Sequence, residues 1–271
     1  MPELPEIETI RRALTLRLAG RRILRVVQRR PDLRFALPVN LPERLAGRTF
    51  TSFGRRAKYL LAGLDDGQTL LLHLGMSGRL LLDGPAIGLH EHLTFEVDDG
   101  GVLRFVDPRR FGMLDLVASG RLAEHPRLAG LGLEPLDPNF DGAALGAALI
   151  GRRSALKVAL MDQRLVVGVG NIYASESLFR ARLSPQRIAA DLRPGQADRL
   201  AAAIRAVLED AIGAGGSSLR DYVQTDGTLG VFQNRFAVYA RAGQACPVCA
   251  RPVRKLLQAN RATFLCSFCQ R

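Results

Sequence analysis

The chain has 271 residues, 47% of them hydrophobic, and a formal net charge of +12 at pH 7. This composition supports a folded core of one large or two ordinary domains, and no apolar run approaches the length of a membrane span. The excess positive charge suits a polyanionic partner, either nucleic acid or an anionic membrane surface, and a basic surface without a partner is the alternative.

The first eighteen residues predict an amphipathic helix. Hydrophobic side chains recur every three or four positions, at Ile7, Ile10, Leu14 and Leu18. Pro5 suits the first turn of such a helix, and the glutamates before and after it suit its positive end. No basic segment followed by an apolar one opens the chain, so we expect no export and a cytoplasmic location.

Residues 22–118 predict strands. The segments "RRILRVVQRR", "RTFTSFGRRAKYLLAGL", "QTLLLHLGMSGRLLL", "HLTFEVDDGGVLRFV" and "GMLDLV" are short, partly alternating and separated by turn residues. Among the turns, "DDGG" is a strong hairpin signal. Several strands at this spacing favour an antiparallel sandwich, and the turn-rich, non-periodic "LGLEPLDPNFDG" marks the expected end of that domain.

The following region predicts helices at about 141–150, 154–161, 171–180 and 195–213. The run "LVVGVGNIYASESLF" partly matches the Gly-x-Gly-x-x-Gly motif of dinucleotide-binding folds. Tyr173 stands where that motif needs its third glycine, so the match fails. Asn171 behind flexible glycines could cap the helix or help its backbone N–H groups hold a phosphate, and the sequence leaves both open.

All four cysteines lie near the carboxyl end, as Cys246-x2-Cys249 and Cys266-x2-Cys269. Disulfides are improbable in a reducing compartment, and a redox motif would need one pair within a βαβ unit. Two such knuckles instead predict one structural Zn²⁺ ion held by four thiolates.

Three turns carry side chains suited to DNA. "VDPRRFGML" places Arg109 and Phe111 between two strands, where Phe111 either enters the core or acts as a wedge between base steps. "HLGMSG" places Met76 in a turn, where it could fill a gap in a base stack. His90 and His92 lack the spacing of a catalytic metal site, so surface or phosphate-contacting roles are expected.

Taken together, these motifs resemble the formamidopyrimidine-DNA glycosylases, bacterial 8-oxoguanine glycosylases with abasic-site lyase activity. The match rests on "MPELPEIETIRR", "RRAKYLL", "HLGMSG", "DPRRFG", "LMDQRLVVGVGNIYASESLF", "GGSSLRDYVQTDGTLGVFQ" and the cysteine-rich end with "QANRATFLCSFCQR", in the family's order. The sister family, endonuclease VIII, is expected to begin PEGPE, so Leu4 favours the branch that acts on purine lesions.

The resemblance implies an α+β fold in three parts. These are a catalytic β-sandwich domain with a leading helix at 1–130, a helical helix–two-turn–helix DNA-binding domain at 131–235, and a β-hairpin zinc finger at 236–271. The implied partner is double-stranded DNA containing oxidised purines, with no membrane and no small-molecule cofactor, and the protein is expected to be a monomer.

The resemblance also assigns catalytic roles. Removal of Met1 would leave Pro2 with a free secondary amine as the nucleophile, and an unperturbed α-amino group is partly neutral at physiological pH. Glu3 matches the general acid–base, with Glu6 as a supporting carboxylate. Lys58 matches the proton donor for β-elimination, and Arg261 the donor for δ-elimination.

The remaining matched positions are DNA contacts. Met76, Arg109 and Phe111 match the trio that fills the gap left by an everted base. His90, Arg153, Lys157 and Asn171 fall on DNA- or phosphate-contacting positions. An aromatic residue is expected where Val231 stands, in the loop that closes over the lesion, and this departure bears on lesion preference.

Two rival functions stay open on the sequence. One is a catalytically silent zinc-finger protein that binds DNA, which would have lost Pro2 or Glu3, and both are present. The other is excision of oxidised pyrimidines, which Leu4 and the Arg109–Phe111 turn disfavour.

Overall fold

A computed structural model describes residues 2–86, 88–219 and 221–271 and divides the chain into two compact units. The first comprises residues 1–129 with 214–231, and the second comprises 130–213 with 232–271. The expected division has three parts, whereas here residues 214–231 belong with the sandwich and residues 236–271 fall in one unit with the helices. Each unit is described by itself.

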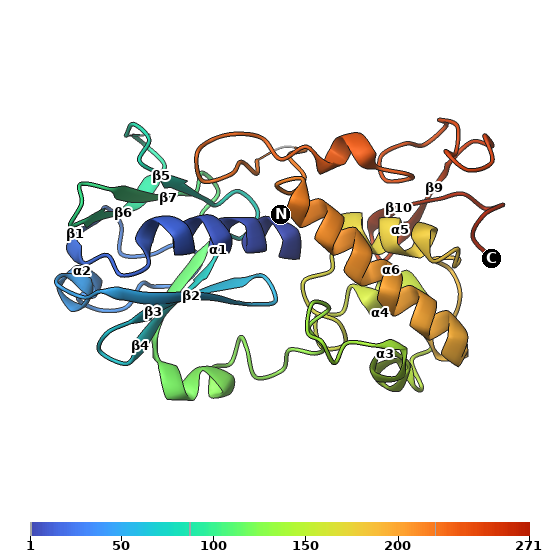
Figure 1. Ribbon diagram of the computed structural model, residues 1–271, viewed down its shortest axis with the longest axis horizontal. Coiled ribbons are helices and arrows are strands. Elements are labelled where there is room, and N and C mark those ends of the chain that lie inside the picture. The colour runs from blue at the N-terminus through green and yellow to red at the C-terminus, as the bar shows by residue number, and fades with distance from the viewer. Residues whose placement is uncertain (1, 87, 220) are drawn as a thin grey trace. The chain divides into compact units, whose positions relative to one another are not determined.

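The first unit is an antiparallel sandwich of two four-stranded sheets (Figure 1). One sheet has the order β1-β6-β7-β5, formed by Ile23–Gln28, Glu91–Val97, Val102–Val106 and Arg79–Leu82. The other has the order β2-β3-β4-β8, formed by Phe50–Arg56, Tyr59–Leu64, Gln68–His73 and Met113–Ala118. The predicted sandwich is confirmed, as is the "DDGG" hairpin, which joins β6 to β7.

Helix α1 (Leu4–Leu18) packs on β2 and β3. The predicted stripe of Ile7, Ile10, Leu14 and Leu18 is buried in the sandwich core, so the periodicity identified the correct face. Arg17 near its end pairs with Asp83 after β5 and with Asp99 in the β6–β7 turn. The helix therefore contacts elements of both sheets.

A short helix, α2 (Leu41–Leu45), interrupts the region predicted as strands. Pro42 occupies its first turn, and Leu41 and Leu45 bury one face of it. Only two apolar positions mark these five residues, too few to establish a helical period in the sequence. A 3₁₀ turn, η1 (Ser119–Glu124), follows β8 and also lacks a sequence signal.

The second unit contains the four predicted helices at almost the predicted limits. They are α3 (Gly142–Leu149), α4 (Leu156–Leu160), α5 (Asn171–Arg180) and α6 (Pro194–Gly213), with 3₁₀ turns η2 (Ala189–Asp191) and η3 (Phe232–Arg235). Helix α6 packs against α3 and α5. The hairpin of β9 (Arg254–Gln258) and β10 (Arg261–Leu265) packs on α5 and confirms the predicted cysteine-bearing hairpin. Among the described residues, no helix is long and apolar enough to cross a membrane.

Candidate DNA-binding and catalytic site

The amino end of α1 buries Pro2 and Glu3. Glu3 caps the helix, and its backbone N–H donates to Oε2 of Glu6 at 2.7 Å. The other oxygen of Glu6 accepts from the N–H of Ser217 at 2.8 Å. Glu6 therefore joins the Pro2–Glu3 end of the helix to the segment 214–231. Met1, whose removal the Pro2 role requires, lies outside the described residues.

Lys58 lies in the two-residue turn between β2 and β3 and is only 6% exposed. Its positive charge acts on His73, at the end of β4, which stacks on Tyr59 with ring centroids 4.8 Å apart. The N–H of Gly75 donates to Nδ1 of His73 at 3.0 Å. The neutral imidazole therefore carries its proton on Nε2. The sequence analysis missed His73, although it stands in the quoted "HLGMSG".

His73 should make the protein less stable in mild acid. Burial, with the positive charges of Lys58, Arg34 and Arg127, lowers the pKa of His73 from 6.5 to about 4. Between these values the unfolded chain binds a proton that the folded chain does not, so the free energy of unfolding falls as the pH drops from about 6.5 toward 4. One pKa unit corresponds to about 1.4 kcal/mol, so this group should cost about 2 kcal/mol between pH 7 and pH 5.

Urea unfolding at the two pH values tests this expectation. The variant His73→Gln should lose about 2 kcal/mol less than the wild type on acidification. Equal losses in the two proteins would show that His73 does not titrate in this range.

Two turns bring Met76 close to Arg109 and Phe111. Gly75 has a φ of +62°, and a Cβ on it would lie 2.4 Å from the carbonyl of Phe111, so the two turns touch through their backbones. Met76 and Phe111 are each 40% exposed, and the Arg109 guanidinium lies 4.7 Å from the Phe111 ring centroid. Phe111 does not enter the core, which removes one of the two alternatives that the sequence left open.

Asp107 holds these two turns together. Its fully buried carboxylate accepts from the Ser77 hydroxyl at 2.6 Å and from the Gly112 N–H at 2.7 Å. Ser77 in turn accepts from the backbone N–H of Arg109 at 3.2 Å. The three exposed side chains therefore stand on a rigid, hydrogen-bonded base.

The two histidines of "LHEHL" take different positions. His90 is exposed, and its carbonyl accepts from the N–H of Asp107. His92 is buried and bonds through Nε2 to the Asp107 carbonyl at 2.8 Å. His90 is therefore exposed beside the Arg109 turn, where a partner can reach it. His92 is buried and supports the same turn through its bond to Asp107.

In the second unit, Lys157 and Asn171 form one cluster with the β9–β10 hairpin. The Lys157 ammonium is 1% exposed and donates to Oδ1 of Asn171, the Ala262 carbonyl and the Thr263 hydroxyl. The Asn171 amide also donates to the Ala262 carbonyl, at 3.0 Å. Asn171 is the first residue of α5, whose N-cap is Gly170. Arg153, before α4, is exposed.

Two further residues of this cluster escaped the sequence analysis. Glu176 on α5 is buried, and its carboxylate accepts from the backbone N–H groups of Ala237, Val238 and Tyr239. The Tyr239 hydroxyl lies 3.5 Å from the Asn171 amide, and its ring packs edge-on against Phe264 of β10. Burial raises the pKa of Glu176 against the lowering effect of these hydrogen bonds. The signal available in the sequence was a glutamate, Glu176, on the apolar face of a predicted helix.

The hairpin also presents Arg261. Ala259 and Asn260 both have positive φ and make the two-residue turn between Gln258 and Arg261. Arg261, the first residue of β10, is exposed, and the next residue, Ala262, has its carbonyl held by Lys157 and Asn171.

The four cysteines form one cluster at the base of this module. Their Sγ atoms all lie within 4.8 Å of one another, with Cys246 and Cys269 3.9 Å apart and Cys249 and Cys266 3.5 Å apart. A tetrahedral ion with metal–sulfur bonds of about 2.3 Å separates its sulfurs by about 3.8 Å. The cluster therefore has the dimensions of a four-thiolate metal site.

Comparison with known proteins gives a consistent result along the whole chain. Residues 1–114 match the family model of the formamidopyrimidine-DNA glycosylase N-terminal domain, and residues 131–223 match that of its H2TH domain. Formamidopyrimidine-DNA glycosylases of Acidiphilium cryptum and Methylocella silvestris are 51% and 50% identical to it, over all of both chains in each case.

Solved structures agree. The MutM (Fpg) protein of Thermus thermophilus is 43% identical, with a TM-score of 0.88 over 99% of this chain and 98% of that one. Lactococcus lactis Fpg, solved in a complex with DNA containing an abasic site, is 33% identical, with a TM-score of 0.90 over 99% of both chains. With its sandwich, H2TH helices and four-cysteine hairpin, the chain belongs to the formamidopyrimidine-DNA glycosylase family of DNA-repair enzymes.

Proposed function

We propose that the protein removes oxidised purines, namely 8-oxoguanine and formamidopyrimidines, from duplex DNA through a Schiff base on Pro2 and then cuts the strand by β,δ-elimination. The observation that carries this proposal is the buried Pro2–Glu3 pair at the amino end of α1, fixed by the bond from Glu3 to Glu6. Complexes of Lactococcus lactis Fpg with DNA containing Fapy-dG or an abasic site support the choice of substrate.

Base removal uses Pro2 and Glu3. The neutral Pro2 nitrogen attacks C1′ while the bond from C1′ to the base breaks, and the departing base takes up the proton that the Pro2 nitrogen loses. The nitrogen lone pair then forms a double bond to C1′ as the ring C1′–O bond breaks, and Glu3 protonates the ring oxygen. The product is an iminium ion between Pro2 and C1′. Lysine amines are poor rivals for this step: Lys157 is buried with three hydrogen-bond acceptors, and Lys58, as a proton donor, is protonated and has no lone pair with which to attack.

Strand cleavage follows from the positive iminium, which draws electrons from C2′. A base removes a C2′ proton, the electron pair forms a C2′–C3′ double bond, and the C3′–O bond breaks with release of the 3′ phosphate. In the second elimination a proton leaves C4′, the electron pair forms a C4′–C5′ double bond, and the C5′–O bond breaks with release of the 5′ phosphate. Lys58 and Arg261 donate the protons for the two departing groups, in that order.

The Met76, Arg109 and Phe111 cluster fills the gap left by the everted base. The guanidinium of Arg109 faces the unpaired partner, where cytosine offers the acceptors O2 and N3 and adenine presents an amino group that arginine cannot satisfy. Phe111 wedges the opposite strand and reads no base. His90, Arg153 and Asn171 contact the DNA backbone, and Lys157 supports this contact by holding Asn171, because its own ammonium is buried.

We expect Arg109→Ala to flatten the preference for 8-oxoguanine paired with cytosine over adenine. One well-paired contact is worth roughly 1–3 kcal/mol of base discrimination. Phe111→Ala is the matched control, because it should slow excision from both pairs about equally. Single-turnover excision from the two duplexes measures the ratio, and an Arg109→Ala enzyme that kept the full cytosine preference would contradict this role.

The four cysteines hold one structural Zn²⁺ ion, since four thiolates at these distances match its tetrahedral preference. The ion fixes the base of the hairpin that carries Arg261. Cys249→Ala should lose about one equivalent of zinc per chain and, with it, DNA affinity. Metal analysis and duplex binding measure the two quantities, and undiminished binding after complete removal of zinc would contradict the proposal.

The function itself is tested with a duplex that contains one 8-oxoguanine opposite cytosine. We expect release of free 8-oxoguanine together with strand ends that carry phosphates on both sides of a one-nucleotide gap. Release of the base without strand cleavage would limit the protein to glycosylase activity, and no release from this or a formamidopyrimidine duplex would overturn the proposal.

A further inference from the structure

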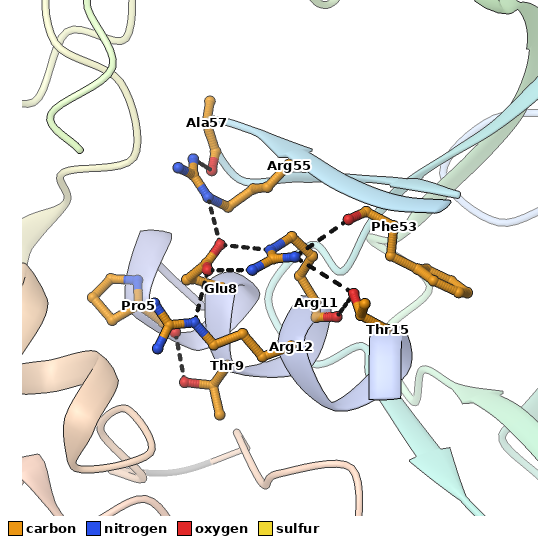
Figure 2. A network of polar contacts seen from close by, with 9 residues as sticks. All are labelled: Pro5, Glu8, Thr9, Arg11, Arg12, Thr15, Phe53, Arg55 and Ala57. Carbon is orange, nitrogen blue, oxygen red and sulfur yellow. Dashed lines mark hydrogen bonds and ion pairs between the residues drawn. The ribbon is translucent and has the colours of Figure 1, made fainter. Parts of the chain in front are cut away.

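A buried carboxylate on α1 gathers three arginines. Glu8 accepts from Nε of Arg11 at 3.0 Å and from Nε of Arg12 at 2.9 Å, and Nε of Arg55 lies 3.5 Å from its Oε2 (Figure 2). Burial raises the pKa of Glu8, but the hydrogen bonds from Arg11 and Arg12 outweigh it and hold that pKa below its ordinary value. The carboxylate is therefore charged at neutral pH.

Of these three arginines, Arg55 belongs to β2 rather than to α1. The side chains of Arg55 and Glu8 are only 8% and 9% exposed, so the pair is shielded from water. The same guanidinium donates through a second nitrogen to the Ala57 carbonyl at 2.8 Å. Figure 2 shows the resulting chain of contacts, from the helix through Arg55 to the turn after β2.

The turn reached by this chain is strained. Ala57 has a φ of +54°, a left-handed conformation that costs free energy for a residue other than glycine and persists where the surroundings impose it. The next residue is Lys58, and Arg56 pairs directly with Tyr59 across the turn. A fixed Ala57 carbonyl therefore fixes where the Lys58 side chain leaves the backbone.

We propose that Arg55, anchored by Glu8, is a positioning residue that sets Lys58 relative to the amino end of α1 for the elimination step. The inference rests on the proposed roles of Pro2 and Lys58. Base removal uses groups on α1 itself and does not need the turn, so loss of the Arg55 contact slows strand cleavage selectively.

The variant Arg55→Lys tests this selectivity. A lysine keeps a positive charge near Glu8, which avoids a buried unpaired carboxylate, but its single nitrogen cannot serve both Glu8 and the Ala57 carbonyl. The matched control is Arg12→Lys, which alters another arginine on the same carboxylate that is 58% exposed and lies on the helix. Glu8→Gln weakens the anchor from its other end and should behave like Arg55→Lys.

Two single-turnover rates are measured for each protein: release of 8-oxoguanine, and cleavage of a preformed abasic site. Misplacing a catalytic group by about 1 Å can cost a hundredfold, so we expect Arg55→Lys and Glu8→Gln to slow abasic cleavage roughly 10- to 100-fold. Base release should change less than about threefold, and the iminium should persist longer, so that borohydride added at later times still traps an adduct. Base release in the same samples also shows that each variant is folded.

The outcomes separate this inference from the function on which it rests. A wild-type enzyme that releases no base or forms no trapped adduct would overturn the proposed function. With an active wild type, parallel losses of both rates, or an Arg55→Lys enzyme no different from Arg12→Lys, would overturn the positioning role alone.

Discussion

An enzyme that retains residues ahead of Pro2 should form no Schiff base and should lose strand cleavage at abasic sites completely. An extension converts the Pro2 amine into a tertiary amide, whose nitrogen has no basic lone pair and cannot form an iminium ion. Lys157 cannot substitute, because its ammonium is buried and donates to three acceptors. Lys58 in its proposed role as a proton donor is protonated, so it has no lone pair with which to attack. Incision of an abasic duplex measures the loss.

The control for this experiment is the same extended protein after a protease has removed the extension, so that Pro2 is again the first residue. Activity should return with the free amine, and binding to an uncleavable abasic analogue should be largely unchanged throughout. Persistent incision by the extended protein would place the nucleophile elsewhere.

Glu3→Gln should slow release of 8-oxoguanine by about 10²- to 10⁴-fold, the range typical for loss of a positioned general acid–base. Glutamine matches glutamate in shape and leaves the backbone N–H of Glu3 free to donate to Glu6, so the helix start should survive. Glu43→Gln, an exposed carboxylate on α2, is the matched control and should have no effect.

If Glu3 acts in base removal, Glu3→Gln should affect two substrates unequally. Cleavage of a preformed abasic site should suffer less than base release, because that substrate has no base to expel. Single-turnover measurements on the two duplexes give the ratio. Equal losses on both substrates would mean that Glu3 acts in forming the iminium rather than in expelling the base.

The sequence predicted the elements whose burial follows a simple period. The stripe of α1 repeats every three or four residues and is buried, and the "DDGG" turn signal coincides with the β6–β7 hairpin. The β2–β3 turn at Ala57–Lys58 lies inside "RTFTSFGRRAKYLLAGL", where no turn was predicted. The cysteine pairs were equally clear, because two short knuckles leave few arrangements for four thiolates. Helix α2 has no such period over its five residues, and it was missed.

Contacts between distant segments could not be predicted from the sequence. Lys157 was expected to contact phosphate, but it is buried and donates to the Ala262 carbonyl, 105 residues further along the chain. Segment 214–231 belongs with the sandwich, and one of its contacts there is the bond from Ser217 to Glu6, across 211 residues. Neither a propensity nor a local pattern encodes partners at such separations.

Supporting residues were harder to identify than exposed ones. The exposed Arg109 and Phe111 could be recognised from an unusual pair in a turn, whereas Asp107, which holds that turn, is fully buried. The same holds for Glu176, whose three backbone partners lie about sixty residues away. Their importance follows from hydrogen bonds that only the folded chain displays.

The role of Pro2 as the nucleophile is tested most directly by incubating the mature enzyme with an 8-oxoguanine duplex in the presence of borohydride and identifying the modified peptide by mass spectrometry. Reduction converts the iminium into a stable amine, so the bond marks the atom that attacked the sugar. We expect a single adduct on the N-terminal peptide, at the nitrogen of Pro2. An adduct on Lys58, Lys157 or Lys255 would contradict it.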